Sequence, residues 1–146
     1  MAALQAEVQS NQGSDKAVNA LGVLYARYGL YEKAEQQFQK TIATKEFVPG
    51  LINLGNIQYR TKNPDKAQEY FERAYKADST NPFAILSLAR IHHEGENYGL
   101  VRKLYAELQK RSPGLAMQFA YLDLKGEEAA RAADIAKAEE TIVWAE

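Results

Sequence analysis

The 146-residue sequence contains no cysteine, and this absence excludes several kinds of site. Disulfides, thiolate nucleophiles and zinc sites with cysteine ligands all require that residue. The chain also contains only two histidines and one tryptophan. A catalytic triad or a histidine-based metal centre therefore has very few residues from which it could be built.

Long apolar runs are also missing. No stretch reaches the ~18 apolar residues that a membrane-spanning helix needs. The first residues, MAALQAEVQSNQGS, lack the basic start and apolar stretch of a signal peptide. We therefore expect a soluble chain and favour the cytoplasm, although the lack of cysteine does not fix the compartment. The helix-like start and the end at TIVWAE are consistent with a piece of a longer protein.

The chain has little net charge of either sign. Its formal charge is −1, so it has no general attraction to nucleic acid or anionic membrane. The charge is nevertheless uneven along the sequence. Ten basic and seven acidic residues give +3 over residues 51–111, and three basic and seven acidic residues give −4 over 112–146. The sequence therefore predicts a mild charge difference between its middle and its end.

Apolar residues recur at helical spacing, and strand-like alternation is absent. A polar residue followed by proline marks three helix starts, at Asn63-Pro64, Asn81-Pro82 and Ser112-Pro113. Ser14 provides a further N-cap. The pattern predicts helices over 2–11, 15–28, 31–44, 49–61, 64–77, 82–94, 97–111, 114–125 and 127–143.

Landmark residues repeat at a spacing of 33 to 34 positions. The sequence resembles the tetratricopeptide repeat family, whose motif is W-x2-L-G-x2-Y, then A-x3-F, then P. The matching residues are Leu21, Gly22, Tyr25, Ala34 and Phe38 in the first unit, Leu54, Gly55, Ala67 and Phe71 in the second, and Leu88, Ala89, Val101, Tyr105 and Pro113 in the third. The departures from the motif include Gln58 and His92, which stand where tyrosine is expected.

This resemblance implies an all-α fold, a right-handed α-solenoid of antiparallel helix pairs with about three full repeats and flanking helices. We expect a single domain over 1–146. It would comprise a leading helix over 1–14, repeats over 15–47, 48–81 and 82–113, and a degenerate repeat or capping helices over 114–146.

Two glycines stand inside predicted helices, where glycine lowers helix stability. We expect Gly22 and Gly55 to lie where the two helices of a pair touch, opposite Ala34 and Ala67. Five aromatic residues would fill the wedge between units: Tyr25, Phe38, Tyr70, Phe71 and Tyr105.

No constellation of residues indicates catalysis. His92 and His93 are adjacent, so on a helix they point about 100° apart and do not share a metal ion easily. We expect His92 to pack at the tyrosine position and His93 to face solvent or a groove. No phosphate-binding loop or nucleophile elbow occurs. The sequence therefore predicts a non-enzymatic protein with no cofactor and no metal.

The resemblance implies a binding groove lined by the first helix of each pair. Carried over by position, the groove residues are Asn19, Val23, Ala26, Arg27, Ile52, Asn56, Tyr59, Arg60, Phe83, Leu86, Arg90 and His93. Three arginines beside Tyr59 and Phe83 favour a protein or peptide segment with acidic and apolar residues. The alternative is an ordinary solvated face.

One subfamily grips acidic chaperone tails with a clamp of lysine and asparagine residues. Asn53 fits one clamp position, but Val23 stands where the clamp has asparagine, and Phe83 and Ser87 stand where it has basic residues. These departures disfavour such a ligand.

The last predicted helix carries apolar residues up to Trp144, whereas a capping helix should have a polar outer face. We expect this end to dock onto the preceding helix pair, onto absent sequence, or onto a second copy through self-association. The predicted function is a non-catalytic scaffold for protein–protein interaction. The alternatives are a structural segment of a longer repeat array or oligomeric assembly, and a regulatory module of a larger enzyme.

Overall fold

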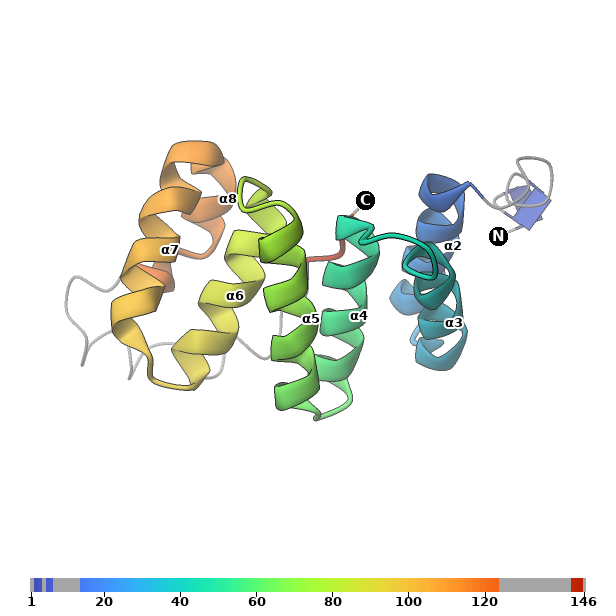
Figure 1. Ribbon diagram of the computed structural model, residues 1–146, viewed down its shortest axis with the longest axis horizontal. Helices are drawn as coiled ribbons and strands as arrows, with labels where there is room; N and C mark the ends of the chain where they lie inside the picture. The colour runs from blue at the N-terminus through green and yellow to red at the C-terminus, as the bar shows by residue number, and fades with distance from the viewer. Residues whose placement is uncertain (1, 4, 7–13, 124–142, 146) are drawn as a thin grey trace. The chain divides into compact units, whose positions relative to one another are not determined.

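The computed structural model (Figure 1) describes residues 2–3, 5–6, 14–123 and 143–145. All regular structure within these residues is helical, which confirms the predicted all-α class. The helices are α2 (Asp15–Arg27), α3 (Tyr31–Thr41), α4 (Val48–Arg60), α5 (Pro64–Ala77), α6 (Pro82–Glu94), α7 (Tyr98–Arg111), α8 (Pro113–Gln118) and the 3₁₀ helix η1 (Ala120–Leu122).

The described residues form two compact units. The first unit contains residues up to 77 together with 144–145, and the second contains 78–123 and 143. In the first unit α2 packs against α3, α4 packs against α5, and α3 also contacts α4. In the second unit α6 packs against α7, and α7 packs against α8. The expectation of a single domain stays a prediction.

The predicted helix ends agree with the structure where proline and polar caps mark them. Helices α5 and α6 have the predicted bounds, and α2, α4 and α7 differ by one residue at one end or both. The prediction of a helix over 31–44 was too long, because α3 ends at Thr41. The Thr41 hydroxyl donates to the Phe38 carbonyl at 2.6 Å, and the Ile42 amide bonds to Gln39 instead of continuing the α-helical pattern.

The prediction of one helix over 114–125 was wrong. The chain forms the short helix α8, followed by η1 over three residues. The Tyr105 hydroxyl donates to the Ala116 carbonyl at 2.8 Å, and the Phe119 amide bonds to the same carbonyl at 3.1 Å. This carbonyl would accept from Ala120 in a continuous α-helix. At the break between α8 and η1, the Ala116 carbonyl therefore accepts from the Tyr105 hydroxyl and the Phe119 amide.

Two of the expected caps are confirmed. The Ser14 side chain accepts from the Ala17 amide at the start of α2, and the Asn81 side chain accepts from the Phe83 and Ala84 amides at the start of α6. Ser112 makes no side-chain cap bond to α8, so its predicted capping role was wrong.

The hairpin turns repeat one backbone conformation. Gly29, Lys62 and Glu96 have φ values of 74°, 69° and 60°, in the left-handed region. After each of them, an amide bonds back to a carbonyl five residues earlier, as Leu30 does to Tyr25 at 2.9 Å. This is the hydrogen-bond pattern of a Schellman helix end. Only the first turn uses glycine, which adopts this φ without a side-chain penalty.

The helix glycines lie against phenylalanine rings. A Cβ added to Gly22 would collide with the Phe38 ring, and a Cβ added to Gly55 would collide with the Phe71 ring. The nearest neighbours are therefore these rings, and the expectation that Ala34 and Ala67 also lie opposite the glycines stays a prediction. All five aromatic residues expected in the wedge are buried. Close approach of the ring is what requires glycine at these positions.

Candidate peptide-binding surface

A pair of buried asparagines connects the two helix hairpins of the first unit. Asn19 is on α2 and Asn53 is on α4, with side chains 2% and 0% exposed. The Asn53 Nδ2 donates to the Asn19 Oδ1 at 2.9 Å. Buried amides are stable only when their polar atoms are hydrogen-bonded, so this pair requires further partners.

The backbone of Ala145 supplies those partners. Its carbonyl accepts from the Asn19 Nδ2 at 3.0 Å and from the Asn53 Nδ2 at 2.9 Å. Its amide donates to the Asn53 Oδ1 at 2.9 Å. Figure 1 shows this end of the chain beside α4. The two asparagines thus hold both polar backbone groups of one residue, distant in sequence and outside any helix.

The described end of the chain therefore docks within the chain and onto its first two hairpins. Docking within the chain was among the expected arrangements, and the hydrogen bonds of Ala145 confirm it, with partners on α2 and α4. The Ala145 side chain is buried and Trp144 is half-buried. The predicted helix over 127–143 lies outside the described residues except for Val143, which is not helical, and most of the predicted helix over 2–11 also lies outside them.

The predicted groove residues of the first unit differ in how far they are buried. Val23 and Ile52 are buried, as are Ala26, Asn19 and Asn56. Tyr59 is half-buried, while Arg27 and Arg60 are exposed at the ends of α2 and α4. The Arg60 Nε donates to the Tyr31 hydroxyl at 3.3 Å, which connects it to the start of α3. The first unit therefore combines a buried asparagine pair with two exposed arginines.

The predicted groove residues of the second unit contact their own chain. Arg90 lies over the Phe119 ring at 5.0 Å, a cation–π distance. His93 is 4% exposed, so of its two expected positions, facing solvent or facing a groove, the first was wrong. Its ring makes edge contacts with Tyr98 at 5.7 Å and with Tyr121 at 5.2 Å. Phe83 and Leu86, also on α6, are half-buried and buried.

Sequence reasoning missed the roles of Asn53 and Ala145. Asn53 was considered only as a chaperone-clamp residue, and nothing in the local sequence marks Ala145. A signal was nevertheless available. Asn19 and Asn53 stand 34 positions apart within apolar stretches of two consecutive repeats, and a buried polar residue in such a stretch needs a partner.

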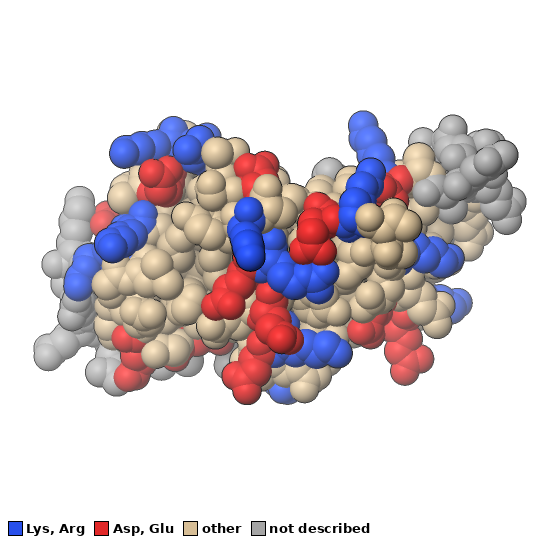
Figure 2. Space-filling view, viewed as in Figure 1, with Lys and Arg blue, Asp and Glu red and all other residues tan. Residues whose placement is uncertain are grey.

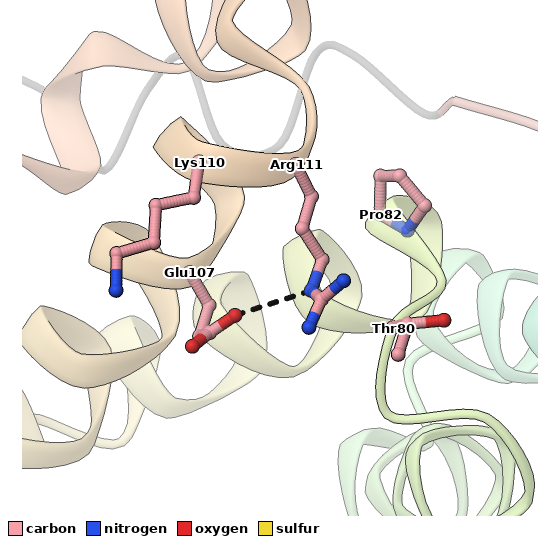
Figure 3. A pocket seen from close by; sticks show the side chains of 5 residues that line it. All are labelled: Thr80, Pro82, Glu107, Lys110 and Arg111. Carbon is pink, nitrogen blue, oxygen red and sulfur yellow. Dashed lines mark hydrogen bonds and ion pairs between the residues drawn. The ribbon is translucent and has the colours of Figure 1, made fainter.

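A hollow in the second unit offers a different surface. Its volume is about 520 Å³, and its lining residues are Thr80, Pro82, Glu107, Lys110 and Arg111. Figure 3 shows Glu107 between Lys110 and Arg111 in this view. The Arg111 Nε lies 3.1 Å from the Glu107 Oε2, and the two side chains form an ion pair. Because the guanidinium is already engaged, this hollow is weaker as an anion site than its two cations suggest.

Most charged side chains occupy the surface in mixed signs. On the face drawn in Figure 2, acidic and basic residues are interspersed. Arg73 donates two hydrogen bonds to the Glu46 carboxylate, at 2.6 and 3.1 Å, and the hydrogen bonding lowers the pKa of Glu46. Hydrogen bonds from Thr80 similarly lower the pKa of Asp78. These pairs stabilise local structure and create no field of one sign.

The described ranges contain no cluster of three acidic or histidine side chains arranged to hold a metal ion. Within the same ranges, no helix has the length and apolar character needed to cross a bilayer. The strongest candidate site in the described residues is therefore the asparagine pair.

Residues 48–81, which contain α4 and α5, match the family model of the tetratricopeptide repeat. This match to the tetratricopeptide repeat covers 34 of the 146 residues. The tetratricopeptide fold generally mediates protein–protein interaction.

The curated proteins that this chain matches are considerably longer than it is. Tetratricopeptide repeat protein 8 of Mus musculus is 25% identical over 91 residues, which cover 62% of this chain and 18% of that protein. Cellulose synthase operon protein C of Escherichia coli (strain K12) is 26% identical over 100 residues, which cover 58% of this chain and 9% of that protein. The chain thus spans less than a fifth of either relative.

Two solved structures share the fold of this chain. The Pseudomonas aeruginosa pilF structure has a TM-score of 0.71 and 19% identity, covering 88% of this chain and 61% of that one. The MamA structure has a TM-score of 0.65 and 17% identity, covering 88% and 77%. At this identity the similarity concerns the fold alone, and it supports the all-α solenoid class.

Proposed function

We propose that the first unit is a non-catalytic peptide-binding module, which holds an extended segment of a partner protein on the face formed by α2 and α4. The hydrogen bonds from Asn19 and Asn53 to the Ala145 backbone carry this proposal. They join side chains of two helices to the main chain of a non-helical residue. Main-chain hydrogen bonding is a general way of binding extended peptides.

The exposed arginines add a preference for acidic residues in the partner. Arg27 and Arg60 end the same two helices that carry the asparagines. Guanidinium groups bind carboxylates through paired hydrogen bonds. The proposed ligand is therefore a segment with apolar residues near the asparagine pair and an acidic residue within reach of an arginine.

The test uses the whole chain and a displayed library of random peptides. Peptides selected on the wild-type chain are synthesised with a fluorescent label, and their affinities are measured by anisotropy. Arg60→Glu should weaken acidic peptides at least tenfold. Lys40→Glu, an equal charge reversal on the exposed surface of α3, should change affinity less than twofold. Equal affinities for both variants would refute the arginine contact, and a library without binders would count against peptide capture itself.

A structural role in a longer repeat array is the second candidate. It is supported by the short coverage of the relatives, since the chain matches only 18% of the mouse protein and 9% of the bacterial one. On this reading, the α2–α4 face would hold neighbouring sequence of the same array. A regulatory module attached to an enzyme is a third arrangement, and the full reading frame distinguishes it from the others.

A further inference from the structure

The segment around Ala145 resembles a bound ligand more than a part of the repeat. Residues 143–145 belong to no helix, and Ala145 lies 92 positions beyond Asn53 in sequence. All three hydrogen bonds between the asparagines and Ala145 use main-chain atoms of Ala145: its carbonyl accepts two and its amide donates one. Such contacts depend on the backbone conformation of the held residue and on a free amide, so another segment could make them too.

The side chains nearby limit which segments fit. Ala145 is only 2% exposed, so the held position accepts a small side chain. Its amide donates to Asn53, so proline is excluded there. Trp144 precedes it and is half-buried, which indicates that an aromatic residue is accommodated next to the small one. The structure therefore describes a ligand class: an extended segment in which a small residue follows an aromatic one.

We propose that residues 144–145 are an internal ligand of this site, and that an external segment of the same class must displace them. The inference rests on the proposed function, since it concerns the same α2–α4 face. A tethered segment competes at an effective concentration on the order of millimolar. An external peptide should therefore bind much more tightly once the internal segment has been released.

Ala145→Pro releases the segment without changing α2 or α4. Proline removes the amide that donates to Asn53, whereas the matched control, Ala145→Ser, retains it. Trp144 is the sole tryptophan, so its fluorescence reports the segment directly. We expect Ala145→Pro to shift the emission to longer wavelength and to increase quenching by acrylamide, while Ala145→Ser resembles the wild type. Unchanged emission in Ala145→Pro would overturn the proposal.

Peptide binding then tests whether the occupied face is the ligand site. A labelled peptide with the sequence of residues 141–146, TIVWAE, should bind the Ala145→Pro chain at least tenfold more tightly than the Ala145→Ser chain. Adding Asn53→Leu to Ala145→Pro should abolish this gain, and circular dichroism establishes that the double variant is folded. A peptide with proline in place of its alanine should bind neither chain.

The two proposals fail in different ways. If library peptides bind both Ala145 variants equally, peptide capture stands and internal competition is refuted. If Ala145→Pro releases Trp144 but neither chain binds any peptide, the segment is a structural contact, and both proposals fail. Wild-type Trp144 emission that changes on dilution would place the segment on a second copy, which would overturn the internal arrangement.

Discussion

The Asn53 side chain donates to the Asn19 side chain at 2.9 Å, across 34 positions of sequence, and the same Asn53 amide reaches the carbonyl of Ala145. One side chain thus connects two successive hairpins to a distant segment. Its removal should affect more than one contact, because each partner would lose a buried hydrogen bond.

Replacing Asn53 with leucine should therefore destabilise the first unit. Leaving buried polar groups unsatisfied costs about 1–3 kcal/mol in the free energy of unfolding. Urea denaturation of Asn53→Leu, Asn19→Leu and the double variant measures both the loss and the coupling between the residues. Additive effects of the two substitutions would contradict a shared network.

Gly55, at the contact between the two helices of a hairpin, allows a prediction about packing. A methyl group at Gly55 meets the Phe71 ring, so Gly55→Ala should destabilise the chain by about 1–3 kcal/mol. The gain in helix propensity, ~1 kcal/mol, offsets only part of this effect. Gly99→Ala is the control, since no heavy atom lies within 4 Å of its Cβ position and α7 is helical there. Recovery of stability in Gly55→Ala with Phe71→Leu would identify the ring as the cause.

Substitutions at two turn residues with left-handed backbone conformation, Gly29 and Lys62, should have opposite effects on stability. Gly29→Ala should lower stability by about 1 kcal/mol, because alanine is strained at a φ of 74°. Lys62→Gly should raise stability by up to about 1 kcal/mol, because it removes the same strain at a φ of 69°. Thermal melts of both variants, compared with Lys66→Gly inside α5, provide the measurement. A loss of stability in Lys62→Gly would show that the lysine side chain outweighs the backbone strain.

The ion pair between Glu46 and Arg73 should make a contribution to folding stability that is lost in acid. Hydrogen bonding to Arg73 lowers the pKa of Glu46 in the folded chain below its usual 4.5. The stabilisation is therefore present above pH ~4.5 and is lost as the pH falls through the folded-state pKa. Both side chains are about half exposed, so screening limits the pair to ~0.2–1 kcal/mol. Wild type and Glu46→Gln should differ in urea stability at pH 7 and converge at pH 3, whereas a constant difference would exclude this linkage.

The contribution of Tyr105 to folding stability should be lost at alkaline pH, the opposite direction to that of Glu46. Burial raises its pKa above 10.0, with a smaller contribution from the negative charge of Asp123. The unfolded chain therefore ionises this tyrosine first, and stability falls as the pH rises above ~10. Tyr105→Phe should cost about 0.5–1.5 kcal/mol at pH 7 by removing the bond to Ala116, and this cost should shrink at pH 11. Tyr28→Phe, at an exposed tyrosine, controls for general alkaline destabilisation; a Tyr105→Phe difference independent of pH would contradict the expectation.

Much of the secondary structure follows from local chemistry. The Asn81 cap, Pro64 and Pro82 act within a few residues of themselves, so the bounds of α5 and α6 could be predicted from the sequence. The end of α3 could not be predicted, because the local sequence does not determine whether the Thr41 hydroxyl bonds to solvent or to the Phe38 carbonyl. The repeat period and the family resemblance likewise predicted that Gly22 is a packing position, but not that its partner is Phe38.

The sequence by itself determined the helix hairpins and their 33- to 34-residue period, because caps, apolar periodicity and repeated landmarks are all local or self-similar patterns. Tertiary structure alone decided which polar groups meet. Asn19 and Ala145 are 126 positions apart, and no periodicity relates them. Their hydrogen bond exists because α2 and α4 bring two buried amides together, and the distant, non-helical backbone of Ala145 bonds to the polar atoms that the pair does not satisfy by itself.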